Sequence, residues 1–402
     1  MANSILTIDM ITRKALEILE NSLVLSRNVN RQYDSAFAVE GAKIGSTIRI
    51  RKPDRALVTT GAALTVQDEN QQYTSLTLAT QKHIGVNFTT AELTMQLSDF
   101  ADLILKPRIS QLAASIDADV ANAYKSIYQS VGTPGTVPST SLVLLQAQQK
   151  LNEAAAMQDP RYATVSPAAN AGLVEGMKGF FNPTGTISRQ FQTGLMGEGV
   201  LGYNEVNMSQ SITSHTRGTN PVAPIVATTV STQGQATLDI SFTSGSPTFK
   251  VGDVFTVAGC YSVNPQTRVS TGSLQQFVVT ADLNISSTTT ATLAISPAIY
   301  TSTNALATVD SFPTSSSVLT FLGSDAGVYP QNLVYHKDAI TLATADLIMP
   351  QGVDMASRQV HNGISMRIVR QYDINNDRLP CRIDVLYGYA VMRPEMACRI
   401  WG

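Results

Sequence analysis

Residues 197–202, GEGVLG, have the glycine spacing of a dinucleotide-binding loop. In such a site Gly197, Gly199 and Gly202 would form a tight turn between a strand and a helix whose N-terminus holds the pyrophosphate. The site also needs an acidic residue about 20 positions later, to bind a ribose hydroxyl. No acidic residue lies near position 222. We therefore expect a glycine-rich loop rather than a cofactor site.

Residues 373–377, DINND, resemble the start of a calcium-binding loop. Asp373, Asn375 and Asp377 stand at its first three oxygen-ligand positions. However, Arg378 replaces the glycine that the sharp bend requires, and Pro380 follows. Because Asn and Asp favour turns through local hydrogen bonds, the segment predicts a hairpin turn.

Other chemistry-bearing residues are few and scattered. The four histidines, which lack metal-ligand spacing, are His83, His215, His336 and His361. The three cysteines, which indicate a reducing compartment and exclude a disulfide framework, are Cys260, Cys381 and Cys398. No P-loop or G-x-S-x-G motif occurs. We predict no catalytic, cofactor or metal site, and hence no enzyme.

Basic side chains cluster in one alternating segment, TIRIRKPDR: Arg49, Arg51, Lys52 and Arg55. Such a cluster is usually a solvated strand edge, which also discourages stray edge pairing. The alternative is a patch that forms salt bridges between subunits. The pattern leaves both open.

Composition limits the class of protein. A chain of 402 residues is long enough for two or three domains. Charged residues make up only 14%, against about 25% in typical soluble domains. Either much of the surface faces other protein, or a Ser/Thr-rich insert dilutes the charge. The net charge of −2 lacks the basic surplus of a tight nucleic-acid binder, although such a chain can still enclose DNA. Neither a signal peptide nor a membrane span is predicted.

Helical periodicity appears in three segments. Apolar residues from Ile8 to Leu23 predict an amphipathic helix of about 18 residues, either an arm for a partner or a helix packed on its own domain. Apolar residues from Ile109 to Ile127 predict a helix of roughly 30 residues, with a kink at Pro107 and a capping box at Thr89 and Glu92 further upstream. A third helix is expected over residues 141–157.

Strand signals fill the remainder. Residues 45–88 alternate as a long hairpin with a polar tip near residues 66–72. Residues 161–165 read as a strand, followed by Ser166 as the N-cap of a helix that begins at Pro167. From Gly218 to Tyr329 short strands alternate with turn signals, which indicates a small β-barrel or sandwich. Mixed segments resume afterwards, so this block is an insertion.

Several stretches resemble the major capsid proteins of tailed phages, in particular the P22-like podovirus coat proteins, which carry an extra β-barrel. The similar stretches include LENSLVLSRNVNRQYD, GSTIRIRKPDR, KPRISQLAASIDADVANAY, HKDAITLATADL, VRQYDINNDR and IDVLYGYAVMRPEMACRI. Each is weak alone, but together they cover most of the chain outside the insert. VGDVFTVAG and GSLQQFVVTAD of the insert also resemble that branch.

The resemblance implies an α+β fold of the HK97 type (Johnson fold). The implied parts are an N-terminal arm (1–44), an extended loop (45–88), a spine helix with peripheral domain (89–135), the first part of an axial domain (136–217), the inserted β-barrel (218–329), and the axial and peripheral return strands (330–402). The insert would lie on the outer face of the shell, assist folding and bridge neighbouring capsomers. Relatives bridge through charged loop residues, whereas this insert has only Lys250 and Arg268 as basic residues.

The resemblance also implies the function. The chain would be a major capsid protein that self-assembles as hexamers and pentamers into an icosahedral shell. Its partners would be a scaffolding protein, a portal protein and enclosed double-stranded DNA that is not read by sequence, with no membrane and no cofactor. Since the first helix starts near Met1, we expect no cleavable N-terminal scaffolding segment and a separate scaffolding protein. Assembly would occur in the host cytoplasm, and the product would be the virion shell. The alternatives are an encapsulin-like nanocompartment protein and an enzyme built around GEGVLG.

Overall fold

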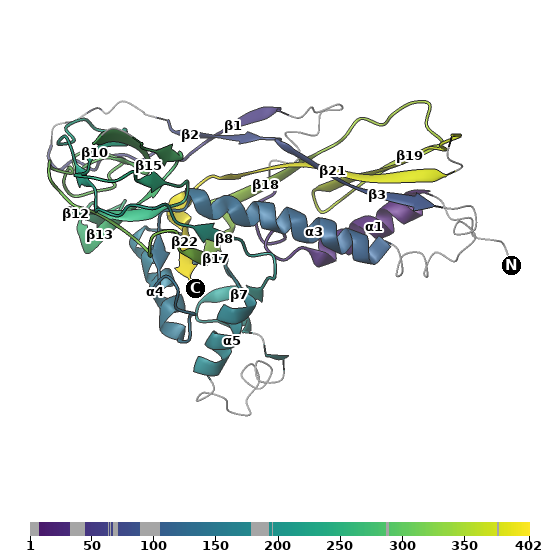
Figure 1. The fold of residues 1–402 in the computed structure, drawn as a ribbon, viewed down its shortest axis with the longest axis horizontal. Coiled ribbons are helices and arrows are strands. Elements are labelled where there is room, and N and C mark those ends of the chain that lie inside the picture. Colours follow the sequence, from purple (N-terminus) through teal and green to yellow (C-terminus); the bar gives the residue numbers. More distant parts are fainter. Residues whose placement is uncertain are drawn as a thin grey trace. The chain divides into compact units, whose positions relative to one another are not determined.

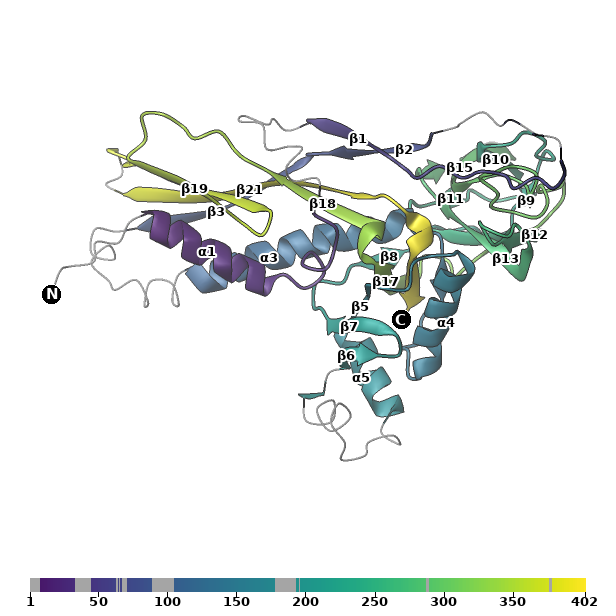
Figure 2. The ribbon, with the colours of Figure 1, turned by 180° about the vertical axis from the view of Figure 1, so that it is seen from behind.

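The computed structural model describes residues 8–32, 45–62, 64, 66, 71–88, 105–177, 193–194, 196–286, 289–375 and 378–402. Helices account for 19% of the chain and strands for 40%, which confirms the predicted α+β class. The chain forms two compact units: unit 1 comprises Met1–Ile50, Tyr73–Val120 and Ile340–Met392, and unit 2 comprises Arg51–Gln72, Ala121–Ala339 and Arg393–Gly402. Figure 1 labels their elements, and Figure 2 shows them from behind.

Unit 1 is a sheet covered on both faces. Its elements are α1 (Ile8–Ser22), β1 (Thr47–Arg51), β2 (Tyr73–Thr77), β3 (Thr80–Phe88), α3 (Lys106–Ala121), β18 (Ile340–Ala345), β19 (Met355–His361), β20 (Ile364–Arg370) and β21 (Leu379–Val391). The long strand β21 pairs antiparallel with β3, β18 and β20, and β20 pairs with β19. β1 and β2 form a separate two-stranded sheet.

Alternate residues of β18 face different layers of unit 1. Leu342 lines a small gap together with Leu19 of α1 and Ile116 of α3, so both helices pack on this face of the sheet. Ala343, the next residue, belongs to a cluster with Leu76 of β2, on the opposite face. This follows from the period of two along a strand, which turns successive side chains to opposite faces.

The helix α1 packs within its own unit. Its apolar stripe is buried, with Ala15, Leu16 and Leu19 almost inaccessible to solvent, and the helix contacts β19 and β20. The hydroxyl of Ser357 also donates a hydrogen bond to the carboxylate of Asp9 over 2.6 Å. Of the two interpretations that the periodicity left open, the structure has the helix docked on its own core.

The helix after Pro107 is shorter than predicted over the described residues. α3 has 16 residues, and the chain then tightens into a 3-10 helix, η4 (Asn122–Ser126), before Ile127 becomes extended. Pro107 is the second residue of α3, where its missing N–H costs no intrahelical hydrogen bond, so it does not kink α3. Thr89 and Glu92 of the expected capping box lie outside the described residues.

The frame of unit 2 is a seven-stranded sheet. Its elements are β4 (Ser130–Val131), α4 (Ser141–Glu153), β5 (Arg161–Val165), α5 (Pro167–Gly176), β6 (Gly197–Val200), β7 (Tyr203–Met208), β8 (Ser214–Thr216), β17 (Val328–His336), η6 (Lys337–Ala339), η7 (Pro394–Met396) and β22 (Ala397–Trp401). The strand order is β4-β22-β17-β5-β7-β6, with β8 also on β17. The predicted cap is confirmed, since the Ser166 hydroxyl accepts a hydrogen bond from the Ala169 N–H. α4 ends four residues before the predicted position 157.

Unit 2 also contains a small β-barrel. Its main strands are β9 (Ile225–Val226), β10 (Gln235–Ser241), β12 (Val254–Val263), β13 (Ser270–Val279), β15 (Thr290–Ile299) and β16 (Leu319–Phe321), in the order β16-β12-β13-β15-β10-β9. A bridge between Ile225 and Val318 closes the ring. A short side pair is formed by β11 (Thr248–Phe249) and β14 (Leu283–Asn284). Among the described residues, the fully buried core of the barrel comes from positions 226–319, and the partly buried Phe321 packs against it.

The barrel is connected to the frame by two adjacent strands. β8 leads into the barrel and the first residues of β17 lead out of it, and the two pair antiparallel, with Thr216 opposite Val328 and Ser214 opposite Pro330. The chain therefore leaves the frame and returns to it at the same place.

Candidate functional site

The glycine motif GEGVLG forms a β-hairpin. Val200 of β6 pairs with Tyr203 of β7, and Leu201 and Gly202 between them have the positive φ angles of a tight hairpin turn. The segment after the glycines is thus a strand, whereas a pyrophosphate site requires a helix N-terminus there. The predicted glycine-rich loop is confirmed.

The DINND segment forms a turn as well. Asp373 and Arg378 are bridged as antiparallel partners, and the Asp373 side chain accepts a hydrogen bond from the Asn375 N–H at 3.1 Å. This is the local hydrogen bonding that makes Asp and Asn turn formers, so the predicted hairpin turn is confirmed. Asp377 lies outside the described residues. In the described part of the chain, no group of three or more potential metal ligands occurs.

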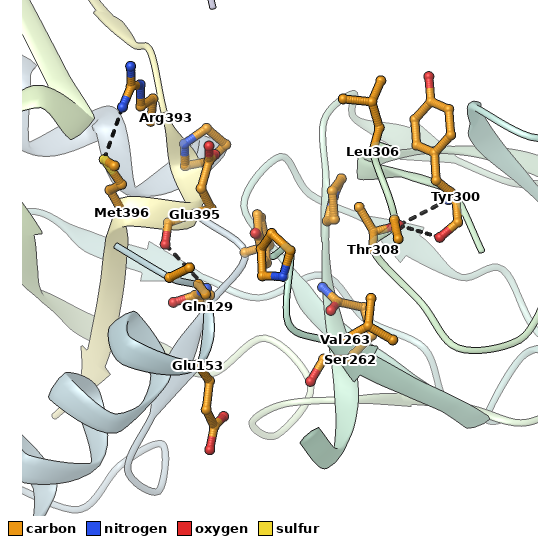
Figure 3. Close-up of a pocket in the computed structure, with 18 of the residues that line it drawn as sticks. Gln129, Glu153, Ser262, Val263, Tyr300, Leu306, Thr308, Arg393, Glu395 and Met396 are labelled. Atoms are coloured by element: carbon orange, nitrogen blue, oxygen red, sulfur yellow. Dashed lines mark hydrogen bonds between the residues drawn. The ribbon is translucent and has the colours of Figure 1, made fainter. Parts of the chain in front are cut away.

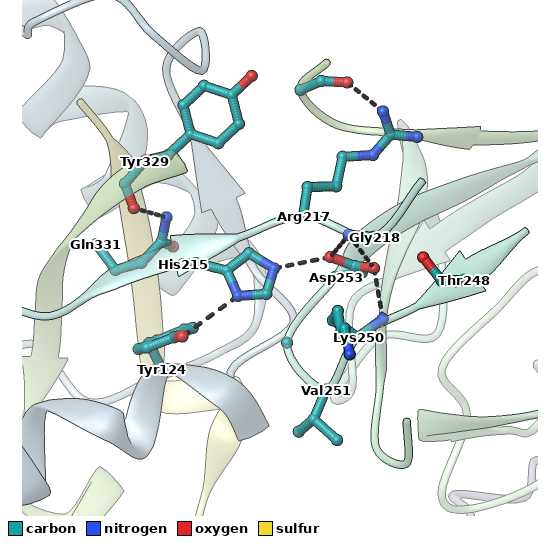
Figure 4. A network of polar contacts seen from close by, with 12 residues as sticks. Tyr124, His215, Arg217, Gly218, Thr248, Lys250, Val251, Asp253, Tyr329 and Gln331 are labelled. Carbon is teal, nitrogen blue, oxygen red and sulfur yellow. Dashed lines mark hydrogen bonds and ion pairs between the residues drawn. The ribbon is translucent and has the colours of Figure 1, made fainter. Parts of the chain in front are cut away.

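His215 is part of a buried polar network that the sequence did not reveal (Figure 4). Its Nε2 lies 2.7 Å from Oδ1 of Asp253, and its Nδ1 lies 3.2 Å from the hydroxyl of Tyr124. Asp253 also accepts hydrogen bonds from the backbone N–H groups of Gly218 and Lys250. The network thereby joins η4 and β8 of the frame to the first residue before β12 of the barrel.

Arg399 of β22 extends this connection. Its side chain is fully buried, and it donates hydrogen bonds to the carbonyl oxygens of Ile127 and Gly252, both over 2.8 Å. Burial lowers the pKa of Arg399 to about 10. Its guanidinium also lies 5.6 Å from the ring of Tyr124.

This network can fix positions but cannot perform nucleophilic catalysis. A His–Asp pair activates a nucleophile only when a hydroxyl or thiol that faces substrate occupies the second imidazole nitrogen. Here that place is taken by Tyr124, and burial raises the pKa of its phenol. Since Tyr124, His215 and Asp253 are all buried, we interpret the network as the anchor of the barrel on the frame.

The predicted basic cluster is divided by the structure. Arg49 and Arg51 lie on the exposed face of β1, where Arg49 stacks over the ring of Tyr73 with 5.2 Å to its centroid. Neither forms an ion pair with a described residue. Lys52 and Arg55 come after the strand and are only partly exposed. Arg55 forms an ion pair with Glu395 over 3.4 Å.

Lys52 and Arg55 line a cavity of about 620 Å³ in unit 2. Figure 3 shows other residues of its lining, among them Gln129, Glu153 and Arg393. Its other walls come from residues 128–129, from α4 and the residues after it, from the β12–β13 hairpin, from residues 296–308, and from residues 393–396. Burial lowers the pKa of Lys52, although the nearby Glu395 acts in the opposite direction. The cavity is therefore a mixed site, with charged, amide and apolar groups.

Neither the polar network around His215 nor the cavity could be predicted from the sequence pattern. His215 is 38 residues from Asp253 and 91 from Tyr124, so no local spacing connects them. The only sequence signal is the rarity of charge in the insert, because an isolated aspartate such as Asp253 in an apolar β segment needs a partner.

Comparison with known proteins gives one family. A family model described as P22 coat protein, gene protein 5, matches residues 1–402. Among curated proteins none matches this chain.

Several solved structures are similar. A structure from Mycobacterium phage Che8 has a TM-score of 0.48 at 11% identity, and the match covers 94% of this chain and 90% of the phage Che8 chain. The capsid of cyanophage P-SCSP1u has a TM-score of 0.42 at 10% identity, with 90% and 84% covered. The CUS-3 coat protein I-domain is 28% identical with a TM-score of 0.20, and the match covers 26% of this chain and 98% of that domain.

Proposed function

We propose how this protein works from one premise: the chain belongs to the P22 coat protein family and is a phage major capsid protein with an HK97-type fold. It is a structural protein rather than an enzyme, and it assembles with copies of itself into the virion shell. The encapsulin-like alternative is less favoured, because the coat protein model matches the whole chain. The finer proposal is that hexamers and pentamers assemble in the host cytoplasm with a scaffolding protein and a portal, and then enclose double-stranded DNA.

One observation carries the proposal for how copies meet. Within residues 51–72, hereafter the 51–72 loop, Val58, Leu64 and Val66 are 85%, 89% and 81% exposed. No helix or strand is described in this loop after Arg51. Exposed apolar side chains gain about 25 cal/mol per Å² when a partner covers them, before association costs. We propose that neighbouring copies cover them in the shell.

The exposed face of β1 would add polar contacts between copies. Arg49 and Arg51 point outward from alternate positions of the strand and lack a described ionic partner. They are the members of the basic cluster that we propose for salt bridges with a neighbour, whereas Arg55 is paired with Glu395 and Lys52 lines the cavity of unit 2.

The barrel supports the proposed domain division. Its core is self-contained, and the chain enters and leaves it through paired strands, as expected for a domain inserted at 218–329 into an axial domain. The remaining boundaries proposed from the sequence are 1–44, 45–88, 89–135, 136–217 and 330–402.

The charge of the chain suits a container for DNA. At a net charge of −2 the wall has no overall attraction for phosphate, so packaged DNA can later leave. In the described residues no helix is long and apolar enough to cross a membrane.

Electron microscopy of cells that express the chain tests this function. The chain is expressed alone and together with the scaffolding protein encoded by the same phage, and particle fractions are imaged in negative stain. We expect uniform icosahedral particles, at higher yield when the scaffolding protein is present. Soluble monomer in both cultures would contradict the proposal.

A further inference from the structure

We infer that the β-barrel has a further role, in which Gln276 closes an open edge of the frame sheet and keeps unassembled copies from pairing there. The inference goes beyond the proposed function, because it concerns the single chain before it joins a shell. The parts involved are the edge strand β4, its neighbour β22 and the barrel strand β13.

β4 is the last strand of the frame sheet on one side. It pairs in parallel with β22, where Ser130 is opposite Arg399. The carbonyl oxygen of Gln129 accepts a hydrogen bond from the Arg399 N–H over 2.9 Å, so the backbone of Gln129 faces β22. Because successive residues of a strand direct their N–H and carbonyl groups to opposite sides, those of Ser130 face away from β22. An edge with such groups is a template for pairing with another chain.

The sequence at this edge favours pairing between copies. Residues 127–131 read IYQSV, with two β-branched residues, one tyrosine and no charge. Short uncharged segments with high β-propensity and no proline are the ones that pair with copies of themselves. The strand order ends on its other side at β6, where Glu198 is exposed and Gly197 and Gly199 have positive φ angles. Charge and irregular backbone discourage pairing at β6, whereas β4 carries no charge.

Gln276 of the barrel occupies the place that another strand would take. Its Oε1 accepts a hydrogen bond from the Ser130 N–H over 2.7 Å, and its Nε2 donates to the Ser130 carbonyl oxygen over 3.0 Å. The same Nε2 lies 3.1 Å from the Ser130 hydroxyl. A side-chain amide has an acceptor and a donor side by side, so it satisfies both backbone groups of one residue, as a paired strand does. Ser130 is accordingly only 3% exposed.

The position of Gln276 follows from the alternation of β13. Phe277 and Val279 belong to the buried core of the barrel. Val278 belongs instead to a cluster that includes Trp401 of the frame. Because side chains alternate along a strand, Gln276 and Val278 share the face that is turned to the frame. One face of β13 thus builds the barrel core, and the other covers the edge of the frame sheet.

Substitution of Gln276 tests this role in unassembled chains. Gln276→Met keeps the length of the side chain and removes its hydrogen bonds to Ser130. Hydrogen exchange with fragment-level mass spectrometry should show that the Ser130 amide exchanges at least about tenfold faster in monomers, because it opens to water. The fraction of soluble chain in oligomers, measured by light scattering, should rise at least about threefold, since an uncovered edge pairs with another edge. In these oligomers the same amide should be protected again.

Two further variants separate the hydrogen bonds from other effects. Gln266→Met places the same side chain at an exposed position between β12 and β13, and it should match the wild type in both measurements. Gln276→Asn stays polar and neutral, but it is one methylene too short to reach both groups of Ser130, so it should behave like Gln276→Met. It also tests the inference if circular dichroism shows that Gln276→Met does not fold.

Slow exchange of the Ser130 amide in both Gln276 variants would overturn the inference. So would fast exchange without increased association, because the open edge would then not pair. Loss of the native fold in both variants would overturn it as well, since the contact would then serve folding rather than protection of the edge. Wild-type chains that form no shells would contradict the proposed function alone, because these measurements use unassembled chains.

Discussion

The β-barrel and the 51–72 loop belong to the same unit, yet the barrel buries its apolar side chains whereas the loop exposes them. The barrel buries Phe255, Phe277 and their neighbours in a core that includes no residue outside 226–319 among the described residues. The loop holds Leu64 and Val66 in solvent. A barrel closes its own edges and can be complete within one chain, whereas an extended loop cannot cover its side chains.

This difference separates folding from assembly. Substitutions in the barrel should act on the free energy of unfolding of the single chain. Substitutions in the loop should act on the association of copies and leave the single chain folded. Substitutions in the anchor around His215 should also act on the free energy of unfolding, but less than those in the barrel core, because the anchor joins the barrel to the frame.

The largest effect is expected in the barrel core. Phe277 is fully buried and stacks on Phe255 with 5.7 Å between ring centroids. Phe277→Ala should lower the free energy of unfolding by about 3–5 kcal/mol, because it removes the buried ring and leaves a cavity. Urea denaturation followed by circular dichroism measures this. Val269→Ala, at an exposed site, is the control and should cost less than about 0.5 kcal/mol. Equal losses for the two variants would contradict a self-contained core.

A smaller loss is expected at the anchor. His215→Ala removes one partner of the buried Asp253 carboxylate, which keeps its bonds from Gly218 and Lys250. The free energy of unfolding should fall by about 2 kcal/mol, as for other losses of a buried charged hydrogen bond. The same denaturation experiment measures it, with His361→Ala as the control at an exposed histidine. If both histidine variants unfold alike, the network does not anchor the barrel.

Substitutions in the 51–72 loop should weaken the association of copies and leave the stability of the single chain almost unchanged. Leu64→Ser with Val66→Ser should change the free energy of unfolding of the single chain by less than about 0.5 kcal/mol. The association of copies should weaken at least about tenfold, since each apolar side chain loses burial in the contact. Light scattering and shell yield report association, and Thr60→Ser in the same loop is the control. Normal shells from the double variant would show that the exposed side chains are not covered by neighbours.

The smallest effect is expected at the basic residues of the barrel. Lys250 pairs with Asp282 over 3.8 Å, and both side chains are about half exposed, so the pair contributes little. Lys250→Ala and Arg268→Ala should both leave shell assembly intact, as counted by electron microscopy. Complete loss of shells in either variant would mean that the barrel bridges neighbours through these ions.

Local features of the fold were predictable from the residues. The cap at Ser166 and the turn at Asp373 depend on interactions within a few residues of one another. The strands of the barrel were predictable as strands, because alternation and turn signals are local, but their pairing, such as that of Gln235 with Ile299, is long-range. Helix ends were less accurate, since α3 changes to a 3-10 helix at Asn122 and positions Tyr124 for a contact with His215. The contact that accompanies this helix end is with His215, which is 91 residues from Tyr124.

The candidate sites were beyond such reasoning. The basic cluster was visible in TIRIRKPDR, but the pattern gave no reason to separate Arg49 and Arg51 from Lys52 and Arg55. The separation arises because β1 ends at Arg51, after which the chain turns its side chains toward Glu395 and the cavity.

The sequence by itself determined the class of the protein: an α+β chain with an inserted, weakly charged barrel and the order of segments of a coat protein. Periodicity, turn chemistry and composition are local properties, and they can be read along the chain. Only the tertiary structure decided that α1 packs on its own unit, that Asp253 meets His215, and that Lys150 and Arg393 share a cavity. Such contacts join residues far apart in sequence, and burial in three dimensions, rather than spacing along the chain, selects them.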